Sequence, residues 1–376
     1  MKKSPHIIHI PVMGTGFSID SAIRVGHFGI STVISIIDDL LVEKIRKHYS
    51  NEYSLPYFII PRWAEDGRAK RISAYLEMVK VIVERNFKAV QELPFFEKND
   101  KEKYFRLLPE NSPLRLEWKR LLDMEPGKLR DEKSSQLTDK MSPGSIDVNI
   151  MAKVDRPNTD KKGKPLGEIY SDARSALRGY AKTPLESSII FSAGINQGLY
   201  SYMTEFKDFY RDASGKIKKK IILKVSDFRS ALIQGKFLAK KGLEVHEFRI
   251  ESGLNCGGHA FASNGELLPV LLKEIREKRA QLSVSFRPLI EKYYEKMGWE
   301  FPKAIRTHEP LITVQGGIGT KGEIDRLVKD FGMDQVGIAS PFLLVPEATC
   351  VDVPTRKKLM GAGEDDLYLS GASPLG

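Results

Sequence analysis

The chain is most constrained by a repeated alternation of short apolar segments with longer segments of helical character. The apolar segments are rich in β-branched residues and are bounded by glycine or polar residues, as strands usually are. Short apolar strands separated by helices are typical of parallel strands that are buried on both faces. The predicted strands are Ile7–Met13, Ser31–Ile37, Asp147–Lys153, Ser188–Gly194, Lys220–Ser226, Glu244–Ile250, Leu311–Gln315 and Gln335–Ile338.

Eight such strands fit an α/β fold of the (β/α)8 or TIM-barrel type. In that fold the active site lies at the carboxyl ends of the strands, and phosphate often binds after strands seven and eight. Glycine and polar residues stand at the ends of the predicted strands, among them Gly14, Asn149, Gly257, Gly316 and Ser340. The sequence therefore predicts a ligand site at this end of the barrel.

A long segment interrupts the alternation after the second predicted strand. Residues 38–144 separate it from the third strand, whereas connections in compact domains usually have about 4–6 residues. We therefore expect a barrel formed by residues 1–37 and 145–355, a mainly helical inserted subdomain at 38–144, and a flexible tail at 356–376. The insertion should cover the active site or build a contact in a homodimer. A second, shorter excursion is expected at 280–309, after a helix over 266–278.

Composition narrows the class of protein. The net charge of +10 favours anionic ligands or partners. Two cysteines, Cys256 and Cys350, cannot form a disulfide framework, and the simplest location is a reducing cytoplasm. No apolar run is long enough to span a bilayer, and no zinc-type spacing or nucleic-acid motif is present. A small-molecule substrate is expected, and neither a membrane, a metal nor a nucleic acid is expected as a partner.

A glycine motif follows the seventh predicted strand. Gly317-Ile318-Gly319-Thr320-Lys321-Gly322 matches G-x-G-x-x-G between a strand and a helix. A dinucleotide site would need an acidic residue at the end of the next strand, but that strand ends in Ile338-Ala339-Ser340. The motif instead suits the phosphate of a mononucleotide at a helix N-terminus. The alternative is a plain turn between strand and helix.

A histidine follows the sixth predicted strand and two adjacent glycines, Gly257 and Gly258. Glycines let the backbone approach a flat ligand closely, and the imidazole of His259 titrates near neutral pH. The pattern favours a reaction centre, and the alternative is a turn whose histidine caps a carbonyl.

Several segments, taken in order, resemble the FMN-dependent barrel family of nitronate monooxygenases and flavin-type enoyl-acyl carrier protein reductases. The resemblance covers about two thirds of the chain and leaves out both excursions. Departures occur at Asn255, Cys256 and Ala339–Phe342, where the family usually has other residues. The resembling segments are Pro11–Gly14, Val148–Met151, Ser192–Gly194, Cys256–His259, Gln315–Ile318, Gly337–Phe342 and Pro346–Ala348.

The resemblance implies FMN as the cofactor and assigns roles to individual residues. His259 would be the catalytic residue near the flavin, which suits proton transfer. Asn149 would hydrogen-bond the ring, and Lys224 would stabilise a reduced anion, with a surface lysine as the alternative. The remaining implied cofactor-binding residues are Met13, Gly14 and Thr15 at the ring, Gly257 and Gly258 beside it, and Gly316, Gly317, Gly319, Ala339 and Ser340 at the phosphate.

The resulting hypothesis is an FMN-dependent oxidoreductase that resembles nitronate monooxygenase. It would oxidise a small substrate by proton abstraction and flavin reduction. One alternative is an NAD(P)H-dependent enoyl-thioester reductase, for which the basic charge would suit an acidic carrier protein. Another is a non-catalytic flavin-binding barrel.

Overall fold

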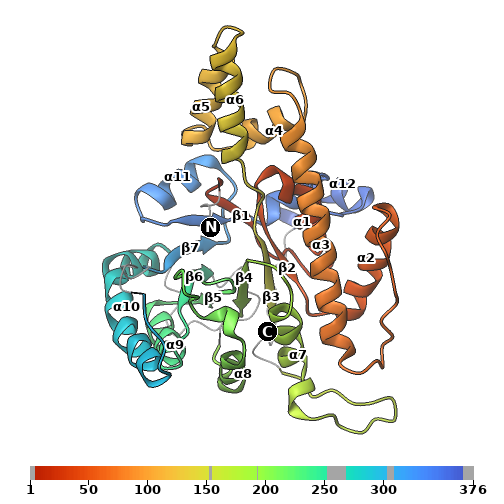
Figure 1. Ribbon diagram of the computed structural model, residues 1–376, viewed down its shortest axis with the longest axis vertical. Helices are drawn as coiled ribbons and strands as arrows, with labels where there is room; N and C mark the ends of the chain where they lie inside the picture. The colour runs from red at the N-terminus through yellow and green to blue at the C-terminus, as the bar shows by residue number, and fades with distance from the viewer. Residues whose placement is uncertain (1–4, 152–154, 193, 252–267, 303–308, 367–376) are drawn as a thin grey trace.

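The computed structural model describes residues 5–151, 155–192, 194–251, 268–302 and 309–366, and it contains a closed parallel barrel (Figure 1). The strands pair in sequence order, and β8 pairs with β1. This confirms the predicted (β/α)8 class. The strands are β1 (Ile8–Ile10), β2 (Ser31–Ser35), β3 (Ile146–Ile150), β4 (Ser188–Phe191), β5 (Lys220–Val225), β6 (Val245–Glu251), β7 (Leu311–Gln315) and β8 (Gln335–Gly337).

Helices occupy the connections around the barrel. In the described ranges, none of them is long and apolar enough to cross a membrane. Between β2 and β3 lie α2 (Asp39–Glu52), α3 (Gly67–Glu92), α4 (Asp100–Leu107), α5 (Pro113–Leu122) and α6 (Lys128–Lys140). The others are α1 (Ser21–Val25), α7 (Asp172–Ala181), α8 (Gln197–Tyr202), α9 (Phe228–Ala239), α10 (Leu268–Lys296), α11 (Lys321–Lys329) and α12 (Val353–Gly361).

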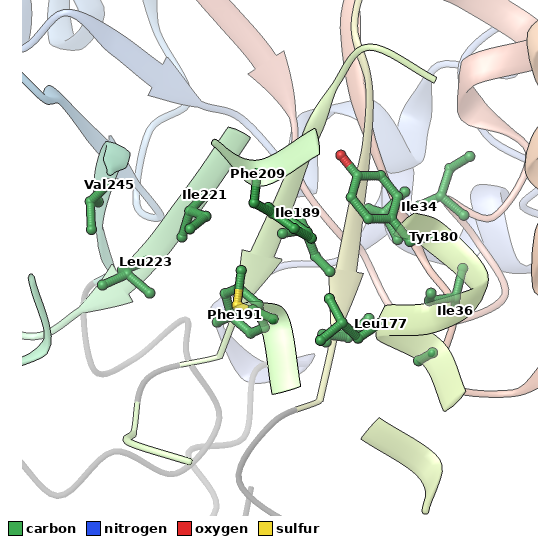
Figure 2. Packing of buried hydrophobic residues seen from close by; sticks show 14 of the residues in the cluster. Ile34, Ile36, Leu177, Tyr180, Ile189, Phe191, Phe209, Ile221, Leu223 and Val245 are labelled. Carbon is green, nitrogen blue, oxygen red and sulfur yellow. The ribbon is translucent and has the colours of Figure 1, made fainter. Parts of the chain in front are cut away.

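The main core lies between the outward faces of the strands and the surrounding helices. Figure 2 shows Ile34, Phe191 and Leu223 from three strands in one apolar cluster with Leu177 and Tyr180 of α7. All five side chains are fully buried. Burying a large apolar side chain stabilises the fold by about 1.5–3 kcal/mol, so this cluster fixes the helices against the barrel and holds the strand ends in place.

The segment between β2 and β3 packs in two different ways. Leu76 and Tyr75 of α3 are fully buried in the same cluster as the barrel strands. In contrast, Phe105 of α4 and Trp118 of α5 stack at 5.7 Å in a second cluster that includes Phe28. Helix α3 therefore contributes to the barrel's own core. Whether residues 38–144 fold as a separate subdomain stays a prediction.

Two segments differ from the sequence-based expectation. The helix expected to end at 278 continues as α10 to Lys296, through Pro288, so much of the expected second excursion is helical. Its apolar residues Leu282, Phe286 and Ile290 keep a four-residue spacing and are buried, and this packing stabilises the helix around the proline. Helix α12 also extends into the segment expected to be a flexible tail, up to Gly361.

Candidate functional site

A cavity of about 890 Å³ opens at the carboxyl ends of the barrel strands. We call it the barrel cavity. It is lined by side chains from β2 to β7, by the loops after β1, β7 and β8, and by Leu359 of α12. Its volume lies in the range typical of sites for small molecules and cofactors, and its position is that of active sites in this fold.

Seven of the predicted site residues lie together around this cavity. Five of them belong to the loops that follow β7 and β8, and two are side chains on strands of the barrel. The structure thus brings the two sequence-distant halves of the predicted site into one space. These residues are Asn149, Lys224, Gly316, Gly317, Gly319, Ala339 and Ser340.

The loop after β1 contributes different residues from those expected. Pro11 and Val12 line the cavity. The Met13 side chain instead packs in the cluster with Phe28 and Trp118, and its amide donates a hydrogen bond to Ser18 Oγ at 3.1 Å. Gly14 and Thr15 follow in the turn beyond Met13. The structure therefore has Pro11 and Val12, and not Met13, Gly14 or Thr15, among the residues that line the cavity, and the contact of those three with a cofactor stays a prediction.

The predicted catalytic histidine cannot be placed. Gly257, Gly258 and His259, like Cys256, lie outside the described residues. Strand β6 ends at Glu251, which lines the barrel cavity. The role of His259 stays a prediction.

Lys224 is held inside the cavity by a carboxylate. Its Nζ lies 3.2 Å from Glu251 Oε1, and the two side chains are 20% and 6% exposed. The side-chain amide of Gln315 donates to the same carboxylate oxygen. A lysine solvated on the surface, the alternative reading of the sequence, does not fit this position. The ammonium group is instead directed by its partner within the barrel cavity.

Below this pair lies a second pair of charges that the sequence interpretation missed. Arg249 lines the cavity, and its Nε donates to Glu247 Oε1 at 2.8 Å, with both side chains at most 4% exposed. Burial alone would raise the pKa of Glu247, but the Arg249 guanidinium lowers it below its ordinary value. The signal was present in the sequence: Glu247, Arg249 and Glu251 alternate along β6, which places them on one face of the strand.

A neutral histidine lies beside these charges. His9 of β1 is buried, and burial, followed by repulsion from Arg249, lowers its pKa to about 3. A Cβ on Gly337 would lie 2.8 Å from His9 Nε2 and 2.7 Å from Gln315 Cβ. Only a glycine therefore lets β8 pass next to the imidazole. With this pKa, His9 is uncharged at neutral pH.

The glycine loop after β7 has open space at Gly317, but its amides at Gly319 and Thr320 already have a hydrogen-bond acceptor. Gly317 has a φ of +68°, and a Cβ added there would meet no atom within 4 Å. At the start of α11, however, the Gly319 and Thr320 amides both donate to Glu323 Oε2 at 2.9 Å. A phosphate therefore fits beside Gly316, Gly317 and Ser340, but at Gly319 it would compete with a carboxylate for the same amide.

This arrangement offers a polar wall and a glycine-lined approach within one cavity. It can accept hydrogen bonds from a flat ligand, place an ammonium group next to it and admit a phosphate. In the part of the chain that the structure describes, no group of three or more His, Cys, Asp or Glu side chains could hold a metal ion. A comparison with protein-family models found no match, and a search of curated proteins found none either.

Proposed function

We propose that the chain is an FMN-dependent oxidoreductase that takes a small-molecule substrate in the barrel cavity. The observation that carries this proposal is the convergence of Asn149 and Lys224 with the glycine loop at Gly316–Gly317 around one cavity of about 890 Å³. Such a cavity suits a ligand that has a flat polar ring at one end and a phosphate at the other.

Each of these residues would have a separate role in binding or reaction. Asn149 would hydrogen-bond the flat ring, and the open approach at Gly317 would admit the phosphate. Lys224, held by Glu251, would place positive charge where negative charge develops on reduction. FMN, when bound, would supply the electron-transfer chemistry. A proton would be taken from the substrate by His259, whose role rests on the sequence alone.

The choice of substrate class rests on the sequence resemblance and not on the shape of the cavity. Oxidation of a nitronate or a similar acidic carbon compound is the reaction that the sequence resemblance favours. Reduction of an enoyl thioester by NAD(P)H is the alternative, with an acidic carrier protein as the partner. Homodimer formation and a cytoplasmic location are further expectations from the sequence.

The first test is the visible spectrum of the purified protein and the mass of any chromophore released on denaturation. If the protein is colourless, it is titrated with FMN, FAD and riboflavin, and binding is followed by flavin fluorescence. Selective binding of FMN supports the proposal. A protein that carries no flavin and binds none of the three contradicts it. Turnover of nitronates without NAD(P)H, compared with NAD(P)H oxidation in the presence of enoyl thioesters, then separates the two reactions.

A matched pair of glycine variants tests the position of the phosphate. Gly317→Asn places a side chain in the proposed approach, and Gly298→Asn does the same at a left-handed glycine after α10, with φ +67° and open space around its Cβ. Asparagine tolerates left-handed backbone, so strain is similar in both. We expect only Gly317→Asn to abolish FMN binding. Equal affinities in the two variants would place the phosphate elsewhere.

A further inference from the structure

A second cavity, of about 830 Å³, lies outside the barrel cavity. Its walls are the connection between α2 and α3, the first turn of α3, and the segment 156–172 that leads from β3 to α7. In Figure 1 this last segment is the light-green loop below α7, and α5 and α6 lie at the opposite end of the molecule. The proposed flavin site uses none of the residues that line this second cavity.

The α2–α3 wall of the second cavity is fixed by buried polar contacts. Glu43 of α2 accepts hydrogen bonds from the Ile60 amide and the Tyr57 hydroxyl, both at 3.0 Å. Arg71 of α3 donates to the Pro61 carbonyl at 2.7 Å. The connection is therefore held in one conformation although it carries exposed apolar side chains, among them Trp63 at 48% exposure.

The opposite wall is a short hairpin. Thr159 and Pro165 form an antiparallel bridge, and the Leu166 amide donates to the Asn158 carbonyl at 2.8 Å. Lys161 and Lys162 occupy the tip of this hairpin and line the cavity. The hydrogen bonds of the hairpin therefore fix the backbone that carries these two exposed lysines at the rim.

Most charges in the second cavity neutralise one another. Arg68 and Arg71 both pair with Asp39, each at 2.5 Å, and Arg156 pairs with Asp172 at 3.2 Å. These contacts hold the walls together and leave little net charge. The cavity's affinity for an ion must therefore come from the side chains that take no part in such pairs.

The remaining charges are mostly positive. Among the described residues, no ion pair is formed by Arg62, Lys161 or Lys162, and the acidic lining residues without one are Glu65 and Asp160, whose carboxylate accepts backbone amides of the hairpin. No side chain caps the first turn of α3, which also faces this cavity, and an uncapped helix N-terminus favours an anion. Three cations against two carboxylates leave the rim with a net positive charge, which favours phosphate groups.

Aromatic rings stand beside these cations. Trp63 is half exposed and lies under the Arg62 guanidinium at 4.9 Å from its centroid. Tyr170 also lines the cavity, with the Arg178 guanidinium 5.6 Å from its ring. Planar nitrogenous bases stack on such rings, and every base offers a flat face for this contact. The cavity thus combines surfaces for a base and for phosphates.

We propose that the second cavity binds a phosphorylated purine nucleotide, with its base against Trp63 and its phosphates at Arg62, Lys161 and Lys162. The proposal does not depend on a flavin in the barrel. Three sources share this chemistry: a free nucleotide such as ADP, the adenylate part of NADPH, and the adenylate part of coenzyme A.

The test is calorimetric titration of the full chain with ADP, NADPH and coenzyme A in separate experiments at low ionic strength. Adenosine and pyrophosphate serve as half-ligands. We expect at least one of the three to bind with a Kd below about 1 mM, more tightly than either half-ligand, and binding should weaken as salt screens the charges. The ligand that binds best identifies the source.

Two sets of variants localise the binding. Lys161→Ala/Lys162→Ala should weaken it by at least about tenfold, and Trp63→Leu should weaken it while leaving pyrophosphate unaffected. The matched control is Lys128→Ala/Lys133→Ala on α6, which removes the same charge elsewhere. Failure of all three ligands to bind, or equal weakening by both lysine pairs, would overturn the proposal.

A flavin readout keeps the two sites apart. If FMN binds in the barrel, the nucleotide should add to the protein without displacing it, so the flavin absorbance should stay unchanged during the titration. Displacement of FMN by the nucleotide would mean that both compete for the barrel cavity, and the second site would be rejected. Absence of flavin binding alone leaves the nucleotide titration valid.

Discussion

The carboxylate of Glu323 accepts a hydrogen bond from the backbone amide of Gly319, with Oε2 2.9 Å from the nitrogen. Thr320 and Glu323 together form a capping box at the start of α11, which satisfies amides that would otherwise lack partners. The same amides are those that a phosphate bound after the seventh strand would use. The helix N-terminus therefore carries its own anion, and the charge of Glu323 opposes a phosphate there.

This relationship predicts that Glu323→Gln strengthens FMN binding. Glutamine can still accept the hydrogen bonds of the capping box, but it lacks the negative charge that repels the phosphate. Removing one unfavourable charge near a helix N-terminus should raise the affinity for FMN severalfold, and less at high salt, because the side chain is exposed. Fluorescence titration with FMN and with riboflavin measures it. Riboflavin has no phosphate, so its affinity should not change; an equal gain for both ligands would refute the explanation.

The ion pair between Lys224 and Glu251 leads to a prediction about stability. Lys224→Met should leave a carboxylate that is 6% exposed without its cation, at a cost of roughly 1–3 kcal/mol in the free energy of unfolding. Adding Glu251→Gln should recover most of this loss, because the remaining amide carries no charge. Urea unfolding of the wild type, the two single variants and the double variant completes the cycle. Strict additivity of the two changes would show that the pair is not coupled.

The barrel could be predicted because its signal is repeated. Each of the eight strands carries apolar residues on its outward face, and each is separated from the next by a helix or a long connection. The glycine loop at Gly316–Gly317 and the side chain of Asn149 could be placed because the end of a strand fixes their position. Strand β1 ends at Ile10, three residues earlier than expected, and Pro11 and Val12 of the loop that follows it line the cavity.

Tertiary contacts determined what the sequence could not reveal. The pairing of Arg249 with Glu247 follows from one strand face, but the contact of Lys224 with Glu251 depends on the register between β5 and β6, which aligns Lys224 with Arg249, two residues before Glu251. The second cavity joins Trp63 to Lys161, almost a hundred positions away, and no local pattern links them. Helices were predicted at 38–144, but the packing of α3 against the barrel could be read only from the fold.

Burial of His9 predicts that acid destabilises the protein. Burial lowers its pKa to about 3 in the folded chain, against an ordinary value of 6.5 for an exposed histidine. Between these values the unfolded chain binds a proton that the folded chain does not, so stability is complete above about pH 6.5 and falls as the pH is lowered towards 3. His6, whose burial lowers its pKa to about 4, acts in the same direction. Urea unfolding at pH 5 and pH 7 should therefore give a lower free energy at pH 5.

Two variants assign this pH dependence to its source. His9→Gln removes the titrating group, and the difference between pH 5 and pH 7 should shrink by an amount of order 1–2 kcal/mol. His48 is 67% exposed, so His48→Gln should leave the difference unchanged. If both variants show the wild-type difference, the pH dependence comes from other groups.

The packing of α3 yields a last prediction, which concerns the unity of the fold. Leu76 is fully buried in the cluster that also contains the outward faces of the barrel strands. Leu76→Ala should therefore lower the stability of the barrel itself by about 2–5 kcal/mol. Val81→Ala on the same helix is the control, because Val81 is 48% exposed.

If residues 38–144 unfold as an independent subdomain, Leu76→Ala will shift only one of two transitions and leave flavin release at the wild-type urea concentration. A single transition in which helical signal and flavin are lost together at a lower urea concentration would show that α3 and the barrel form one cooperative unit.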